Sequence, residues 1–415
     1  MSRSCLAILW LCSGACLAAP ELQVAGEWLN FATVQGVREN SPYNPGNNLA
    51  GLPNTRFESV LRGNLRLNAA PFVLAIGPRL TGRRDYGTND ASTNTTHEEL
   101  YLQSWQMEYR GAAVDLFYNR ELLLWGPSLF ASPSNPFFRD TNQVNPFTEL
   151  PSRAFVGGRW RFSDTSQLNL LVNVDDGRDS EVLRHFKAIT ALQLEHRGYD
   201  YSLGVVAANR DGKWRSGLYG QHTLGESAVL YADGAWFASS DRLIARQQGS
   251  DWALTTRPER NYVDLLLGGA YTFSGGVTIN AELRRNGEGY DAGERRAMAR
   301  YAQFHADGFT GNDPATIGRS AQALGAVVQP HASTYGRNYL LLQYNDQQIA
   351  ERTSLVMQWS YSIDSHESTV TAVISHDAGD RIRLQANLNA FTGSGSGEYH
   401  KYLDYAIFTG AKIFF

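Results

Sequence analysis

The sequence predicts an all-β chain that forms one transmembrane, antiparallel, up-and-down β-barrel of about 18 strands, of the outer-membrane type. Three observations lead to this prediction. Apolar and polar residues alternate in many short segments, long and short connections alternate between those segments, and the chain ends on Phe415. Transmembrane strands span only ~9–11 residues and are marked by alternation rather than by bulk hydrophobicity. The pattern is therefore more informative than the composition.

The N-terminal residues 1–18 are predicted to be a cleaved signal peptide. Arg3 supplies a positive start, an apolar run follows, and Cys16-Leu17-Ala18 is a small-x-small cleavage signal, so we expect cleavage after Ala18. Lipidation at Cys16 is the alternative, but Ser13 stands where an aliphatic residue is normal. All three cysteines lie in this segment, which leaves none for a disulfide or a metal site in the exported chain.

Composition predicts that residues 19–415 form a single domain. No later stretch reaches the ~18–20 apolar residues that a spanning helix needs, and no linker or low-complexity tract divides the chain. The 39 glycines, nine tryptophans and 12% aromatic content suit strands with tight turns and aromatic girdles. A net charge of -4 is too small to indicate a nucleic-acid partner.

Period-two segments recur along the whole chain. Leucines at 61, 65 and 67 alternate with Arg62, Asn64 and Arg66, and similar alternation covers 277–284 and 381–390. The eighteen strands are predicted near 24–34, 56–68, 71–81, 98–110, 112–124, 153–163, 166–174, 186–197, 199–208, 213–223, 227–237, 261–273, 276–285, 337–346, 352–362, 367–376, 380–391 and 402–415. The last strand is the expected contact with the barrel-assembly machinery.

The connections give an independent check. If the first strand runs outward, odd-numbered connections are extracellular and even-numbered ones are short periplasmic turns. Turn residues fill the even slots, as in Asp377-Ala378-Gly379-Asp380. The long connections all fall in odd slots, at about 35–55, 82–97, 125–152, 238–260 and 286–336. Within the last of these, 292–304 reads as a helix, either a lid over the mouth or a solvated surface helix.

Arginine dominates the basic residues, with 33 arginines against four lysines. Eight arginines are predicted to point into the lumen: Arg62, Arg66, Arg79, Arg159, Arg161, Arg284, Arg381 and Arg383. The acids Asp264, Glu282 and Asp404 interrupt them. A basic lumen would favour anions. The alternative is that these arginines pair with neighbouring acids across strands.

The segment from Trp125 to Pro151 holds five of the fourteen prolines. Proline restricts the backbone and lowers the entropic cost of ordering a loop. We expect this loop to fold into the pore as a constriction, with Phe137, Phe138, Arg139 and Asp140 at its middle. The alternative is an ordered external loop above the membrane.

The same region resembles the alginate-export-type and related outer-membrane channel families. The matching positions in "NRELLLWGPSLFASPSNPFF" are Asn119-Arg120-Glu121, Trp125-Gly126 and Asn135-Pro136. Asn119 and Glu121 depart from the usual glycine and glutamine. The resemblance implies an eighteen-stranded outer-membrane channel, and in that group the conduit is lined by arginine and lysine and carries an acidic polysaccharide.

The predicted function is a porin-like channel in the bacterial outer membrane for hydrophilic, anionic or saccharide-like solutes. The partners would be outer-membrane lipid and the solute, with a polysaccharide as one candidate solute, and no cofactor or metal is expected. An alternative is a non-conducting surface barrel that binds polysaccharide, with Trp236, Trp252 and Tyr335 as sugar platforms. An enzyme is not expected, because neither a Gly-x-Ser-x-Gly elbow nor a His-Glu-x-x-His motif occurs.

Overall fold

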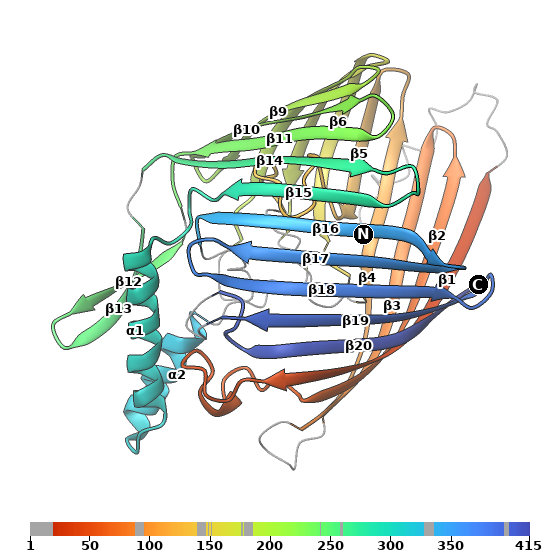
Figure 1. Cartoon of the computed structure of the whole chain (residues 1–415). Coiled ribbons are helices and arrows are strands. Elements are labelled where there is room, and N and C mark those ends of the chain that lie inside the picture. The colour runs from red at the N-terminus through yellow and green to blue at the C-terminus, as the bar shows by residue number, and fades with distance from the viewer. Residues whose placement is uncertain are drawn as a thin grey trace, which may run out of the picture.

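The chain forms a closed antiparallel β-barrel of eighteen strands in a computed structural model (Figure 1). The structure describes residues 20–87, 95–138, 147, 149–150, 152–175, 177, 186–240, 242–257, 260–327, 336–393 and 398–415. The predicted signal peptide lies outside these residues. The barrel strands are β1 (Glu21–Val37), β2 (Thr55–Ala69), β3 (Phe72–Tyr86), β4 (Thr95–Arg110), β5 (Val114–Glu121), β6 (Arg153–Ser163), β7 (Ser166–Asn173), β8 (Ile189–Arg197), β9 (Tyr201–Arg210), β10 (Lys213–Leu224), β11 (Ala228–Phe237), β14 (Tyr262–Thr272), β15 (Thr278–Arg285), β16 (Asn338–Ala350), β17 (Thr353–Ser362), β18 (Glu367–Asp377), β19 (Ile382–Thr392) and β20 (Leu403–Phe414). All eighteen predicted strands are confirmed.

The two faces of the wall differ as the alternation predicts. On β2 the outward Leu61 is 43% exposed, whereas its neighbour Arg62 is 8% exposed inside the barrel. On β15 the outward Ile279 and Leu283 are exposed, and Glu282 between them is buried. An apolar outer face with a polar interior is the pattern of a transmembrane barrel.

The barrel closes where β1 pairs with β20. Beyond the last ladder residue, Phe415 and Gly26 exchange backbone hydrogen bonds of 2.8 and 3.0 Å. The ring of Phe415 lies against the space that a Cβ at Gly26 would occupy. The aromatic terminus therefore fits a site on β1 that only a glycine leaves open.

The two ends of the barrel are unlike. At one end, the short-turn end, tight turns such as Ala70-Pro71 join β2 to β3 and the chain ends at Phe415. The other end, the long-loop end, carries the long predicted connections and every element outside the barrel wall (Figure 1). In the part of the chain that the structure describes, these elements are the short 3-10 helix η3 (Pro45–Asn47), the helices α1 (Ala292–Phe309) and α2 (Pro314–Gly325), and the hairpin of β12 (Leu243–Gln248) and β13 (Asp251–Thr256). Among the described residues, no helix is long and apolar enough to cross a membrane.

Helix α1 confirms the helix predicted at 292–304 and extends it to Phe309. Its start is a capping box, in which Asp291 and Glu294 satisfy each other's backbone N–H groups. Helix α2 and the β12–β13 hairpin were not predicted. Asp313 caps α2 and Pro314 opens it, and this pair is a helix-start signal that the glycine- and alanine-rich stretch around it obscured.

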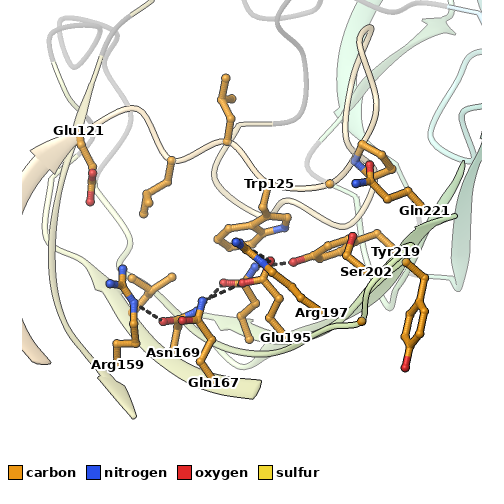
Figure 2. Close-up of a pocket in the computed structure, with 18 of the residues that line it drawn as sticks. Glu121, Trp125, Arg159, Gln167, Asn169, Glu195, Arg197, Ser202, Tyr219 and Gln221 are labelled. Carbon is orange, nitrogen blue, oxygen red and sulfur yellow. Dashed lines mark hydrogen bonds and ion pairs between the residues drawn. The ribbon is translucent and has the colours of Figure 1, made fainter. Parts of the chain in front are cut away.

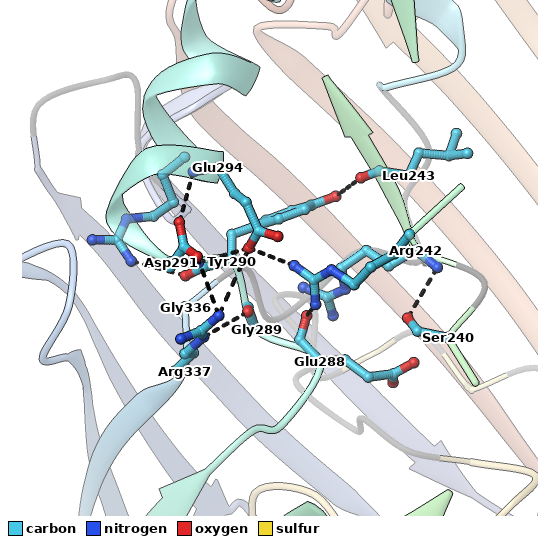
Figure 3. Close-up of polar contacts among 12 residues, drawn as sticks. Ser240, Arg242, Leu243, Glu288, Gly289, Tyr290, Asp291, Glu294, Gly336 and Arg337 are labelled. Atoms are coloured by element: carbon cyan, nitrogen blue, oxygen red, sulfur yellow. Dashed lines mark hydrogen bonds and ion pairs between the residues drawn. The ribbon is translucent and has the colours of Figure 1, made fainter. Parts of the chain in front are cut away.

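These elements pack into one small unit, here called the cap. Its apolar core is Tyr43, Ile244, Ala245, Tyr290, Met298, Tyr301, Ala302, Leu324 and Val327. Figure 3 shows the polar contacts that hold the cap to the long-loop end, where Arg337 donates to Gly289 O at 3.0 Å and Tyr290 donates to Leu243 O. Arg257 adds an ion pair with Glu294 at 2.6 Å.

The closing seam gives a first prediction. Gly26→Val should displace the Phe415 ring and cost about 1–3 kcal/mol, the usual penalty for overpacking. Gly82→Val is the matched control, since nothing lies within 4 Å of a Cβ at that strand glycine. Refolding yield, measured by the heat-dependent gel shift of folded barrels, should fall for the first variant and stay near that of the unmodified chain for the second. Equal yields would contradict the seam described here.

Candidate channel constriction and lumenal cavity

The described residues of the connection between β5 and β6, which spans 122–152, turn into the barrel. They contact the inner faces of strands on several sides of the wall, including β2, β3, β4, β10, β11 and β15. This segment is called the lumen loop below. Prolines and serines alternate through its first part, and this composition favours tight turns.

Glu282 on β15 holds one end of the loop's first part. Its carboxylate accepts the backbone N–H groups of Leu129 and Phe130 at 2.6 and 3.1 Å. The Tyr231 hydroxyl on β11 donates to the same carboxylate at 2.9 Å. The Tyr231 ring lies over β14 on the way, in the space that the absent side chain of Gly268 leaves open. A buried carboxylate that accepts several hydrogen bonds is a strong anchor for a loop.

Asp233 on β11 holds the next turn of the loop. It accepts the Ser132 hydroxyl at 2.6 Å and the Ser134 backbone N–H at 2.8 Å. Arg215 on the neighbouring β10 donates to Pro133 O between these two serines. Three consecutive loop residues are therefore fixed to adjacent strands of one wall.

Aromatic side chains hold the loop to the other side. Phe137 packs edge-on against Phe155 of β6, with ring centroids 4.8 Å apart, and against Trp125 at 5.7 Å. Phe138 lies under the guanidinium of Arg153 at 5.2 Å. Two of the four residues predicted for the constriction, Phe137 and Phe138, thus lie in the lumen loop as described, whereas Arg139 and Asp140 fall outside the described residues.

The last part of the loop reaches β1, β2 and β3. Phe147 stacks on Phe31 at 4.7 Å, and Arg62 donates to Phe147 O. Glu149 accepts from Arg79 at 2.7 and 2.9 Å. Burial raises the pKa of Glu149, but the hydrogen bond from Arg79 and the charges of Arg62 and Arg79 outweigh it, so the pKa lies below its ordinary value.

Three more of the predicted arginines also meet carboxylates. Arg159 and Arg161 both approach Asp115, the former at 3.6 Å. Arg284 pairs with Asp264 at 3.0 Å, with both side chains buried. The cross-strand pairing that the sequence left as an alternative is therefore present at these three arginines and at Arg62, which pairs with Glu27 of β1. Arg79 instead pairs with Glu149 of the lumen loop.

The three remaining arginines differ from one another. Arg383 pairs with Asp377 at 2.6 Å near the short-turn end. Arg66 donates to the neutral side chains of Asn68 and Gln106. Arg381 lies in the turn before β19 and is exposed. Arg66 is thus the predicted lumen arginine whose described hydrogen bonds go to neutral amides.

A cavity of about 690 Å³ lies between the lumen loop and the short-turn end (Figure 2). Trp125 and neighbouring loop residues cover it, and the inner faces of β4 to β10 form its wall. Across that wall Arg159 donates to Asn169 at 3.2 Å, Asn169 to Gln193 at 3.0 Å and Gln193 to Tyr219 at 2.7 Å. This row of hydrogen bonds fixes the side chains before any solute arrives.

Sequence reasoning listed Glu282 only as an interruption among arginines and did not identify Asp233. The sequence signal that could have identified both residues is an acid at an inward position of a strand. The pattern of a single strand does not show which loop will contact that acid. Trp236 points outward and Trp252 packs against the cap, and Tyr335 falls outside the described residues. Within the described residues, no cluster of histidine, cysteine or acidic side chains could hold a metal ion.

Comparison with solved structures identifies the fold. The chain is similar to OccK7 (OpdD) of Pseudomonas aeruginosa, with a TM-score of 0.55 and 14% identity over 95% of this chain and 99% of that one. For OccK5 (OpdH) of the same organism the TM-score is 0.53 and the identity is 11%, over 95% of this chain and 98% of that one. For a mutant porin of Rhodopseudomonas blastica the TM-score is 0.45 and the identity is 9%, over 95% of this chain and 100% of that one. The matches to OccK7 and OccK5, together with the strand pairing, show that the chain has the closed eighteen-stranded fold of outer-membrane porin-type barrels.

No protein-family model matches the chain, and no curated protein matches its sequence. The alginate-export resemblance remains a prediction on these findings. These structural matches show the fold alone, so the expectation that the chain is not an enzyme also stays a prediction.

The anchors of the lumen loop give a second prediction. Asp233→Asn together with Glu282→Gln keeps the side-chain shapes but removes two charged acceptors, each worth about 1.5–3 kcal/mol. The loop should then leave the wall part of the time, and proteolysis from within the lumen or hydrogen exchange at 128–134 should increase. Asp115→Asn is the control, because Asp115 is equally buried but pairs with arginines of β6. Unchanged exchange in the double variant would contradict the anchoring role.

Proposed function

We propose that the chain is a porin-like channel through which small hydrophilic solutes, anionic or saccharide-like, cross the bacterial outer membrane passively. The long-loop end would face outside and the short-turn end the periplasm, with residues 1–18 removed during export. The lumen loop would set the size limit. The observation that carries this proposal is the attachment of the loop's described residues to the inner wall at several points, which supports a fixed narrowing of a polar lumen.

The charges of the lumen bear on the solute. An arginine that pairs with a carboxylate adds little net potential for a distant anion, because the two fields nearly cancel. Of the eight predicted arginines, Arg62, Arg79, Arg159, Arg161, Arg284 and Arg383 have such partners. The compensation favours polar, weakly charged solutes such as saccharides over strongly anionic ones, and Arg66 remains as the site of a mild anion preference.

A second candidate function is a non-conducting barrel that binds polysaccharide at its outer surface. The cap favours it, since a packed unit with its own apolar core offers a stable binding surface. The channel requires a continuous water path past the lumen loop, and the surface barrel does not. Conductance therefore separates the two.

A planar bilayer measurement tests the channel. The refolded mature chain should give steady single-channel steps, with a reversal potential under a salt gradient that is only mildly anion-favouring because most lumen arginines are paired. Absence of steps from a correctly folded barrel would contradict the channel and support the surface-binding function.

A charge variant tests the electrostatic part separately. Replacing Arg62, Arg66, Arg381 and Arg383 together with Ser should move the reversal potential toward cations without unfolding the barrel. The shift has two causes, because positive charge is lost and Glu27 and Asp377 lose their partners. The single variant Arg66→Ser should give a smaller shift of the same sign. An unchanged reversal potential in the fourfold variant would contradict a role for these arginines in selectivity.

A further inference from the structure

The cavity below the lumen loop has a wall of amides. Six amide side chains line it: Gln106, Asn119, Gln167, Asn169, Gln193 and Gln221. Each amide offers both donors and an acceptor, which matches a hydroxyl that also donates and accepts. The volume of about 690 Å³ lies within the range of small-molecule sites.

The three arginines of the same cavity lie near carboxylates, and the acids Glu121 and Asp200 also line it. Arg110 lies 3.0 Å from Glu108, and Arg197 lies 3.0 Å from Glu195. Arg159, at the edge of the amide row, lies 3.6 Å from Asp115. A solute with a negative charge gains little from such a lining. A neutral solute with many hydroxyls meets donors and acceptors in alternation.

Some polar side chains of the wall face the cavity with donors and acceptors that the described residues do not use. Gln221 on β10 is exposed to it, and its side chain has no hydrogen-bond partner among the described residues. Ser202 stands directly opposite on β9, and Figure 2 shows both beside Tyr219. The amide row from Asn169 to Tyr219 is fixed by its own hydrogen bonds, so the free groups sit on a rigid support.

Aromatic side chains complete the cavity. Trp125 covers it from the lumen loop, and Figure 2 shows its ring above the polar wall. An indole ring presents an apolar face to the C–H groups of a sugar, while the sugar hydroxyls point toward polar neighbours. An aromatic cover over an amide wall is thus a surface suited to a sugar ring.

We propose that this cavity is a binding subsite for a neutral saccharide unit, with Trp125 stacking on the sugar ring and Gln221 and Ser202 hydrogen-bonding its hydroxyls. The proposal rests on the channel function above, because it places the subsite on the periplasmic side of the constriction. It narrows the solute class from anionic or saccharide-like to neutral polyhydroxyl compounds.

Calorimetric titration of the refolded chain in detergent tests the subsite directly. Maltose should bind, and digalacturonate, a disaccharide of similar size with two carboxylates, should bind more weakly. Gln221→Leu with Ser202→Ala should weaken maltose binding by about 2- to 10-fold for each hydrogen bond lost, and Trp125→Leu should also weaken it. Gln343→Leu is the matched control, because this amide pairs with Asn280 on β15 outside the cavity.

The titration separates the subsite from the channel. A barrel that conducts but shows no maltose binding would overturn the subsite and leave the channel standing. A silent barrel that binds maltose through Gln221 and Trp125 would overturn the channel and support the subsite. Tighter binding of digalacturonate, or equal loss of maltose binding in Gln343→Leu, would overturn the neutral-saccharide assignment.

Discussion

The arrangement of the lumen depends on two carboxylates, Asp233 and Glu282, that point inward from neighbouring parts of the wall. A loop inside a barrel must satisfy its backbone N–H groups, since buried groups without partners are costly. The carboxylates accept the N–H groups of Leu129, Phe130 and Ser134. In return the loop supplies donors to two buried acids that would otherwise need water or a basic partner. Loop and wall therefore stabilise each other.

The same requirement for compensation runs through the rest of the interior. Arg79 meets Glu149 of the loop, and Arg284 meets Asp264 of the adjacent strand. Each pair removes a charge that a passing solute would otherwise meet. Most of the predicted lumen arginines are compensated in this way, and under the proposed function this compensation would suit solutes recognised by hydroxyl groups rather than by net charge. The amide wall under Trp125 follows the same principle.

Much of the fold could be predicted from the sequence, because alternation and connection length report directly on strands and barrel ends. The prediction of an inward Arg62 beside an outward Leu61 needed only the period of two. The partners of Arg62 could not be predicted in that way, since Phe147 O comes from a loop 85 residues later. Proline content predicted an ordered segment at 125–151, and its described residues 125–138 are held to the wall by hydrogen bonds. The contact between this segment and Asp233 could not be predicted, because it depends on the curvature of the closed wall. No local sequence pattern encodes that curvature.

The location of the lumen loop is the central claim, and a disulfide between loop and wall tests it most directly. Gly217 on β10 faces the loop so closely that an added Cβ would lie 2.7 Å from Cβ of Ser134. A small shift reaches the ~3.5–4.5 Å that a disulfide requires, and the three native cysteines lie in the predicted signal peptide. In cells that export the Ser134→Cys, Gly217→Cys variant, oxidation should cross-link the pair and change the migration of the unfolded chain, whereas either single variant should not change. Two cysteines that both react with a maleimide and never cross-link would show that the loop lies outside the lumen.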